Sequence, residues 1–185
     1  MNNEQADLIL MELEEHMQKT VDVLIRDFAG IRTSRANPAL LDKIQLEYYG
    51  VMTPLKQISS IAAVEGNQLY IKPFDKSILK SVEHAIHASD LGLNPINDGV
   101  GIRLILPQLT EQRRRELVKD CEKMGEHARV AIRNVRRDGN DHLKKLGLTE
   151  DDEKGYLEDV QELTNTYVKH VDEEVKNKSE ELLKI

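Results

Sequence analysis

ARVAIRNVRRDGND, residues 128–141, lies at the centre of the stretch that decides the fold, residues 117–146. Small or apolar residues recur there at alternating intervals of four and three. This spacing is typical of a helix that packs along one stripe against other helices. The stripe contains Leu117, Cys121, Met124, Ala128, Ala131 and Val135. We therefore predict a long helix inside a helical bundle.

Basic residues of the same helix avoid this stripe. At about 100° per residue they gather on one side of the helix, roughly 80–180° from the stripe. A guanidinium group stays charged and can bond two oxygens at once, so this side suits the phosphates of structured RNA. We call these arginines, together with the two residues that continue their stripe, the arginine flank; its members are Arg129, Arg133, Arg136, Arg137, Asn140 and Lys144.

Composition limits the class of protein. Of the 185 residues, 32% are charged and 4% are aromatic, and there is no tryptophan, which favours long solvated helices. The single cysteine, Cys121, lies on the apolar stripe, so we expect a reduced, buried thiol. No apolar run approaches the about 20 residues of a membrane span, and the first residues do not resemble a signal peptide. We expect a soluble cytoplasmic protein with no membrane partner.

The net charge of −7 argues against nucleic-acid binding, but the distribution of charged residues along the chain does not. Residues 149–185 contain 12 acidic and 5 basic residues, a net of −7, whereas residues 128–145 contain 6 basic and 2 acidic residues, a net of +4. The basic patch is therefore local, and the overall charge is a poor guide to it. The acidic C-terminal region is an alternative partner for the arginines, because ion pairs within a bundle are common.

The two ends of the chain also carry helical patterns. Residues 3–31 predict one helix with the stripe Leu10, Leu13, Met17, Val21, Leu24, Phe28 and Ile31. Thr110 is a fair N-cap for the central helix, Gly147 ends that helix, and Thr149 caps a last one. The stripe of the last helix is Leu157, Val160, Leu163, Tyr167, Val171, Val175 and Leu182.

Between Pro38 and Pro107 the pattern changes to that of a small α+β domain. Residues 43–49 predict a strand, residues 58–65 and 68–73 a hairpin, residues 78–88 a helix capped by Asp75 or Ser77, and residues 102–106 a last strand. The whole chain is thus α+β. Residues 1–32 and 107–185 form an elongated three-helix bundle, and residues 33–106 form the inserted domain. The chain crosses between them twice, which limits twisting but still allows a hinge.

Catalytic or metal chemistry is not indicated. GVGIR, residues 99–103, is too short for a phosphate loop and precedes a strand rather than a helix. His84 and His87 lie one helical turn apart with no third ligand nearby, which favours surface histidines over a metal site. We expect no catalytic residue, no metal and no cofactor.

Several motifs, in order and spacing, resemble those of the ribosome recycling factor family over essentially the whole chain. They are IRTSRANPALLD (31–42), EYYG (47–50), FDKS (74–77), ASDLGLNP (88–95), LPQLTEQRRREL (106–117) and ARVAIRNVRRDGNDHLKKL (128–146). Two residues depart from the family pattern: Ser34, where the family usually has glycine, and Gly139, where it usually has alanine. A glycine inside a helix costs up to about 1 kcal/mol relative to alanine.

The resemblance implies an L-shaped monomer whose inserted domain is a β/α/β sandwich. It implies binding to the 70S ribosome, mainly to large-subunit ribosomal RNA, through Arg129, Arg133, Arg136 and Arg137. With elongation factor G and GTP hydrolysis by that partner, such a protein splits the post-termination ribosome into subunits after release of the nascent chain. It is not itself an enzyme. The hinge is expected at Arg32, Thr33, Ser34, Arg35, Ala36, Leu104, Ile105, Leu106 and Pro107.

The residues alone leave two other functions open. An acidic helical-bundle adaptor would bind another protein, use its arginines for internal ion pairs and bind no RNA. A nucleic-acid enzyme would hold an unrecognised site in the middle domain. Salt-sensitive binding to ribosomes separates a ribosomal factor from the adaptor, and turnover of a nucleic acid without an added GTPase would indicate the enzyme.

Overall fold

A computed structural model describes residues 2–33 and 35–184. Its contacts divide the chain into two compact units. Residues up to 28 and 115–184 form the first, which we call the helical unit, and residues 29–114 form the second, the inserted unit. The finer domain limits of 32/33 and 106/107 stay a prediction.

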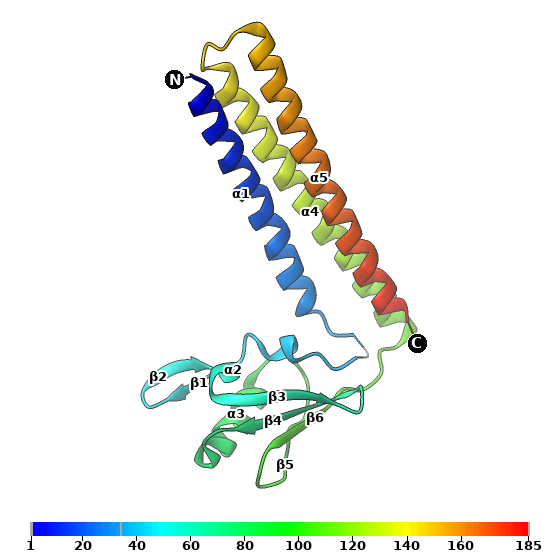
Figure 1. Ribbon diagram of the computed structural model, residues 1–185. Coiled ribbons are helices and arrows are strands. Elements are labelled where there is room, and N and C mark those ends of the chain that lie inside the picture. Colours follow the sequence, from blue (N-terminus) through cyan, green and yellow to red (C-terminus); the bar gives the residue numbers. More distant parts are fainter. Residues whose placement is uncertain (1, 34, 185) are drawn as a thin grey trace. The chain divides into compact units, whose positions relative to one another are not determined.

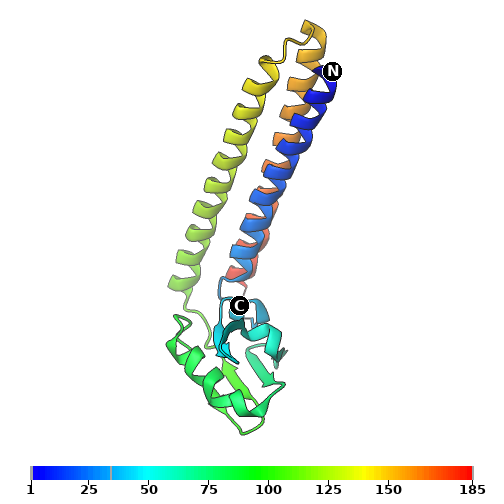
Figure 2. The same cartoon turned by 90° about the vertical axis from the view of Figure 1, so that its left-hand side faces the viewer.

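The helical unit consists of three long helices, α1 (Asn2–Ala29), α4 (Glu111–Lys144) and α5 (Glu150–Leu183). Helices α1 and α5 run in the same direction and α4 runs in the opposite one (Figures 1 and 2). The order of the elements therefore confirms the predicted α+β fold, in which a small α+β unit interrupts a three-helix bundle. In the described part of the chain, no helix has both the length and the apolar character that a bilayer span requires.

The helix ends follow the predicted caps. The Oγ1 atom of Thr110 accepts a hydrogen bond of 3.1 Å from the backbone N–H of Arg113. At the start of α5, Thr149 Oγ1 accepts one of 3.2 Å from the N–H of Asp152. Gly147, with φ of +68°, stands between α4 and α5 in the left-handed conformation that glycine adopts without strain.

The buried stripes of α1 and α5 largely match the prediction. On α1, Leu13, Met17, Val21, Leu24 and Phe28 are buried, but the helix ends at Ala29, so Ile31 does not extend its stripe. The residues after Ala29 form a connecting segment that leads to Pro38. A proline disfavours the helical conformation for the residue before it, here Asn37. On α5, Leu157 and Leu163 are only partly buried, and Thr164 and Lys178 are buried in addition.

The buried stripe of α4 differs more from the prediction. Met124, Ala131 and Val135 are only partly buried, whereas Ile132 and Leu143 are fully buried. Two helices contact α4 from different sides, so its buried surface is wider than the seam of a two-helix contact. Part of that surface is formed by Gly125 and Gly139, which carry no hydrophobic signal in a sequence.

Gly139 is a packing site. A Cβ atom built there would lie 2.6 Å from Cδ2 and 3.0 Å from Cγ of Leu13 on α1. The interpretation of Gly139 as merely a weak helix former was therefore incomplete, because the missing side chain makes room for α1.

The inserted unit contains two antiparallel sheets. The larger has the strand order β3-β4-β6-β5, and the smaller pairs β1 with β2. The strands are β1 (Gln45–Tyr48), β2 (Val51–Pro54), β3 (Ser59–Val64), β4 (Gln68–Pro73), β5 (Ile96–Asn97) and β6 (Ile102–Ile105). The helical segments are η1 (Pro38–Leu41), α2 (Leu55–Ile58), η2 (Lys76–Ile78) and α3 (Leu79–Ala88).

The prediction for this unit was right for β1, the β3–β4 hairpin, α3 and β6, and it missed the strands β2 and β5. Asp75 caps η2, which precedes α3, by accepting a bond from the N–H of Ser77. Strand β2 was missed because it ends in Pro54 and exposes Val51 and Met52, so it lacks a buried apolar face. One core joins both sheets to α3, with Leu46, Ile71, Val82 and Ile102 among its members.

Candidate nucleic-acid interface

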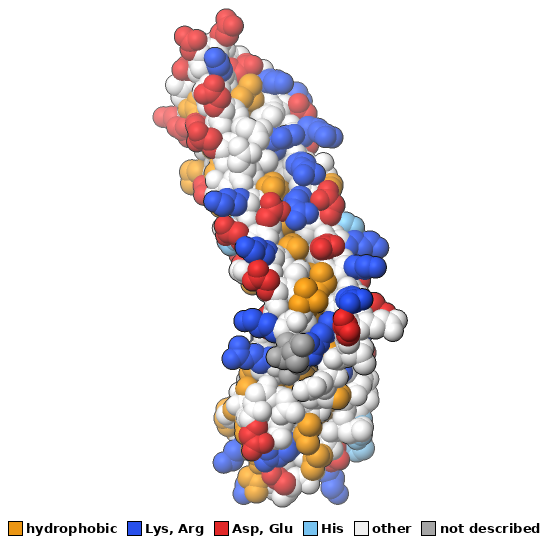
Figure 3. All heavy atoms as spheres, turned by 90° about the vertical axis from the view of Figure 1, so that its right-hand side faces the viewer, with side chains coloured by type: hydrophobic (Ala, Val, Ile, Leu, Met, Phe, Trp, Pro, Cys, Tyr) orange, Lys and Arg blue, Asp and Glu red, His pale blue; other side chains and the backbone are white. Residues whose placement is uncertain are grey.

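The arginine flank lies on α4, and two of its members reach α5. Its contacts to α5 are made by Arg129, which reaches Asp172, and by Arg136, which reaches Gln161. In Figure 3, Lys and Arg side chains gather along the right-hand edge of the upper part of the helical unit, whereas Asp and Glu side chains gather at its upper end. The space-filling view thus agrees with the charge segregation seen in the sequence.

Arg129 is the most enclosed of these basic side chains for which an ion pair is described. Its Nε donates to Asp172 Oδ1 at 2.6 Å and its Nη1 donates to Glu126 Oε2 at 3.1 Å, and its side chain is 20% exposed. Burial alone would lower the pKa of Arg129, but the hydrogen bonds to Asp172 and Glu126 outweigh it and raise the pKa. Arg129 is therefore a permanent cation that ties α4 to α5.

The close approach of the two helices at this point depends on a glycine. A Cβ atom at Gly125, one turn before Arg129, would lie 2.5 Å from Cγ2 of Val175 on α5 and 3.7 Å from Nη2 of Arg129. The absent side chain lets α5 approach, so that Asp172 comes within reach of Arg129. Glu126, Asp172 and Gly125 were not among the predicted site residues. The spacing of three between Glu126 and Arg129 was a usable signal.

The remaining members of the flank are more open. Arg133 is 46% exposed and donates to Glu126 Oε1 at 3.4 Å. Arg136 is partly buried and donates to Gln161 Oε1 at 3.4 Å, whereas Arg137 and Lys144 are exposed. Asn140 is partly buried, and its Oδ1 atom has no hydrogen-bond donor within the part of the chain that the structure describes. The accessible cations are thus Arg133, Arg137 and Lys144.

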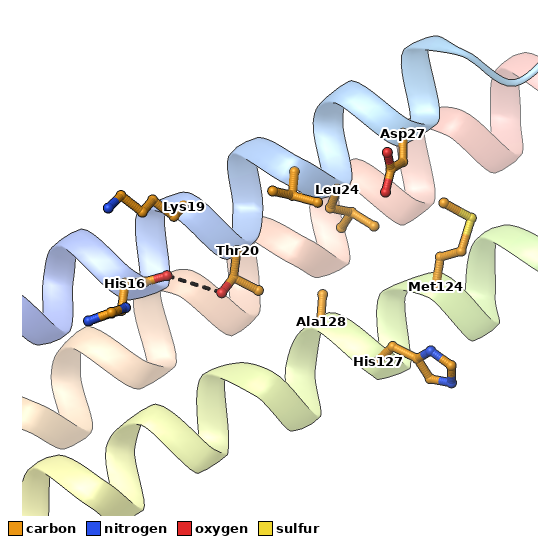
Figure 4. Close-up of a pocket in the computed structure, with 9 residues that line it drawn as sticks. His16, Lys19, Thr20, Leu24, Asp27, Met124, His127 and Ala128 are labelled. Atoms are coloured by element: carbon orange, nitrogen blue, oxygen red, sulfur yellow. Dashed lines mark hydrogen bonds between the residues drawn. The ribbon is translucent and has the colours of Figure 1, made fainter. Parts of the chain in front are cut away.

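The other side of α4 faces α1 and forms a groove of about 470 Å³. In Figure 4, Met124 of α4 points towards α1, and Thr20 of α1 donates to the carbonyl of His16 at 3.0 Å. The groove mixes apolar and charged groups of both signs and therefore lacks the uniform basic character of the flank. Its lining residues are His16, Lys19, Thr20, Val23, Leu24, Asp27, Met124, His127 and Ala128.

The predicted hinge residues are held by hydrogen bonds within the inserted unit. Arg32 donates to the carbonyl of Pro107 at 3.2 Å, which links the two connecting segments. The N–H of Ala36 bonds to Gly66 at 2.7 Å and that of Leu106 bonds to Asn67 at 2.8 Å, so both segments meet the β3–β4 turn.

Other hinge residues are also fixed. Leu104 and Ile105 belong to β6, and Thr33 is buried, with its Oγ1 bonded to the N–H of Arg35 at 3.1 Å. Ser34 lies outside the described residues. A hinge at these residues stays a prediction.

No described residues form a metal site, in the sense of three or more His, Cys, Asp or Glu side chains grouped around a point. His84 and His87 are exposed on α3. In the inserted unit, Asp98 accepts bonds from the N–H groups of Gly101 and Val100, which lower its pKa, and from Tyr70 Oη at 3.0 Å. These bonds organise the turn between β5 and β6.

The fold and the flank together define a class of protein: a three-helix bundle, interrupted by a small α+β unit, with one side of its central helix suited to phosphate. Comparison with known proteins points to one family. A sequence model of the ribosome recycling factor family matches residues 24–183. The chain is 67% identical over 183 residues to the ribosome-recycling factor of Acholeplasma laidlawii, covering 99% of this chain and 100% of the relative.

More distant relatives agree. The ribosome-recycling factor of Streptococcus mutans is 49% identical over 184 residues, covering 97% of this chain and 100% of the relative. A solution structure of ribosome recycling factor is 40% identical, with a TM-score of 0.81 and 98% coverage of both chains. The chain belongs to the ribosome recycling factor family.

A second solved structure comprises models for the T. thermophilus ribosome recycling factor and the E. coli elongation factor G bound to the E. coli post-termination complex. The matching chain is 41% identical, with a TM-score of 0.68, and the match covers 97% of the present chain and 99% of that one.

Proposed function

We propose that this protein acts together with elongation factor G to split the post-termination ribosome into its subunits after the nascent chain has been released. The observation that carries the proposal is family membership over nearly the whole chain, at 67% identity to a named ribosome-recycling factor. The T. thermophilus relative bound with elongation factor G to a post-termination complex supports it. GTP hydrolysis by elongation factor G supplies the energy, so the chain needs no catalytic residue of its own.

The ribosome-binding surface in this proposal is the arginine flank, and its ligand is the phosphate backbone of large-subunit ribosomal RNA. Arg133, Arg137 and Lys144 are exposed on one helix, so their spacing is fixed before binding. Cations carried on an ordered helix suit an RNA whose phosphates are also held in place, because the backbones of both partners are then ordered before binding. The protein acts as a monomer, and a hinge between its two units lets the inserted unit respond to elongation factor G.

Subunit splitting tests the proposal. Purified protein is mixed with post-termination 70S ribosomes, elongation factor G and GTP, and light scattering follows the loss of intact particles. Splitting that requires all three components is the expected result. Salt-sensitive ribosome binding without splitting would refute the coupling to elongation factor G and retain the RNA-binding surface. The absence of any binding to ribosomes would overturn the proposal.

One observation favours a second candidate, the adaptor. Arg129 is already paired with Asp172 and Glu126, as expected if the arginines serve the bundle itself. Such an adaptor would bind a protein partner, and its affinity for ribosomes would be negligible at physiological salt. Ribosome binding that weakens steeply with salt, with a slope that falls when Arg133 is removed, excludes the adaptor.

A further inference from the structure

Two carboxylates lie against the arginine flank, one from each helix. Asp172 of α5 accepts from Arg129 Nε at 2.6 Å. Glu126 of α4 bridges two arginines, because its Oε2 accepts from Arg129 at 3.1 Å and its Oε1 accepts from Arg133 at 3.4 Å. The same donors would otherwise face a phosphate. Any RNA that binds at Arg129 or Arg133 must therefore compete with a carboxylate of the protein.

These carboxylates can be displaced. The side chains of Glu126 and Asp172 are 53% and 54% exposed, and Arg133 is 46% exposed, so water screens the pairs and each is weak. Arg129, at 20% exposed, is held by both acids and is harder to free. The flank is thus graded: Arg137 and Lys144 are exposed, Arg133 is lightly masked and Arg129 is strongly masked.

Carboxylates that cover the arginines to different degrees, as Glu126 and Asp172 do, distinguish between kinds of RNA. A folded ribosomal RNA offers several phosphates at fixed positions, so contacts to the open cations form together with the displacement of Glu126. A flexible single strand must also order its backbone at each contact, so it gains less from displacing a carboxylate. Repulsion between the acids and phosphate acts against both RNAs, but only the structured one compensates for it with many simultaneous contacts.

We propose that Glu126 and Asp172 are selectivity residues, which compete with phosphate for Arg129 and Arg133 and so keep the flank from binding loosely structured RNA. The inference rests on the proposed RNA-binding function of the flank. It assigns two acidic residues to a basic interface, and it predicts that removing either acid improves binding to the wrong RNA more than binding to the ribosome.

The test compares Glu126→Gln and Asp172→Asn with Glu173→Gln, an exposed residue of α5 next to Asp172 whose substitution changes the net charge by the same amount. Fluorescence anisotropy measures the affinity of the full chain for a labelled oligouridylate, and pelleting measures its affinity for 70S ribosomes. For the two mask variants, Glu126→Gln and Asp172→Asn, we expect oligouridylate to bind about two- to fivefold more tightly, and ribosomes to gain less than about twofold. Glu173→Gln, the control, should change the affinities for oligouridylate and for ribosomes by the same small factor.

The outcomes distinguish a failure of the proposed selectivity from a failure of the proposed function. Mask variants that gain no more affinity for oligouridylate than Glu173→Gln, or that gain equally for both RNAs, overturn the inference. If the unaltered protein fails to bind ribosomes, the proposed function fails, and the oligouridylate comparison still decides whether the acids mask the arginines. Thermal melting confirms that each variant is folded, and Glu126→Gln, at an exposed side chain, keeps the test valid if Asp172→Asn loosens α5.

Discussion

Gly139 lies buried on α4, where Leu13 of α1 packs against it. An added Cβ atom would lie 2.6 Å from Leu13 Cδ2, well inside van der Waals contact. We expect Gly139→Ala to lower the free energy of unfolding by about 1 kcal/mol, because overpacking costs about 1–3 kcal/mol and the better helix propensity of alanine offsets about 1 kcal/mol of it. Urea denaturation measures the difference.

Gly155 of α5 is the matched control. No heavy atom lies within 4 Å of a Cβ atom built there. Gly155→Ala should therefore raise the free energy of unfolding by about 0.5–1 kcal/mol through helix propensity alone. If Gly139→Ala stabilised the protein as much as Gly155→Ala does, the described packing of α1 on α4 would be wrong.

Arg133 combines exposure with a place on the proposed RNA surface. We expect Arg133→Ala to weaken ribosome binding at physiological salt and to reduce the slope of log affinity against log salt by about 0.7–0.9, the value for one lost phosphate contact. The free energy of unfolding should change by less than about 0.5 kcal/mol, because the side chain is surface-exposed. Arg26→Ala on α1, where Arg26 is 72% exposed, removes the same charge and should leave the slope unchanged. Equal slopes for both variants would refute the assignment.

As predicted, Cys121 is a free, buried thiol. Its burial makes the stability of the protein depend on pH. Burial raises the pKa of its thiol to about 11. The pKa of a thiol in an unfolded chain is about 8.5, so the folded state has the higher pKa. The thiol's contribution to stability is therefore complete below the unfolded pKa and is lost as the pH rises towards the folded pKa of about 11. Between pH 8 and 11, the unaltered protein should lose stability relative to Cys121→Ala. A constant difference in urea midpoint would contradict this.

At the scale of elements, the start of α5 depends on one hydroxyl group. Thr149 Oγ1 accepts from the N–H of Asp152, and the first turn carries four acids, Glu150–Glu153, which the helix dipole favours. Thr149→Ala should lower the free energy of unfolding by about 1 kcal/mol, and Thr149→Ser should preserve it. Thermal melting of both variants measures this. Equal melting temperatures for the two would show that the cap contributes nothing.

Elements set by local chemistry could be predicted from the sequence. The caps at Thr110 and Thr149 and the stop at Gly147 involve neighbours within a few residues, and the structure has them as expected. Burial that depends on a distant partner could not be predicted. Ile132 is fully buried because two helices meet α4, and the β1–β2 hairpin forms although Val51 and Met52 of β2 face solvent.

The candidate site also has one part that could be predicted from the sequence and one part that could not. The membership of the flank follows from 100° per residue, which is a local property of α4. The pair between Arg129 and Asp172 spans 43 residues and depends on the close approach of α5 at Gly125. No spacing rule within one helix reports it. Sequence patterns therefore located the basic side, and only the fold distinguished its masked arginines from its open ones.

At the scale of the whole molecule, each unit has a core of its own. Among the residues that the structure describes, the core of the inserted unit draws only on the stretch from Ala36 to Leu106. A separate cluster in the helical unit contains Ala6, Leu13, Leu143 and Val160, and the two clusters share no residue. In the inserted unit, the bond from Arg32 to Pro107 also holds the two connecting segments together. The described residues of this core therefore all lie in one continuous stretch of the chain.

We expect residues 29–114, produced alone, to fold cooperatively, because their core and both sheets are complete without the helices. Circular dichroism during urea denaturation should give a single transition. Leu69→Ala, at a fully buried side chain, should destabilise the fragment by about 2–5 kcal/mol, enough to unfold a small domain of ordinary stability. In the fragment, Tyr49→Ala at the exposed tip of the β1–β2 hairpin is the control and should leave the transition near its original midpoint. A fragment without a cooperative transition would mean that the inserted unit depends on the helices for its stability, and that the chain folds as one cooperative whole.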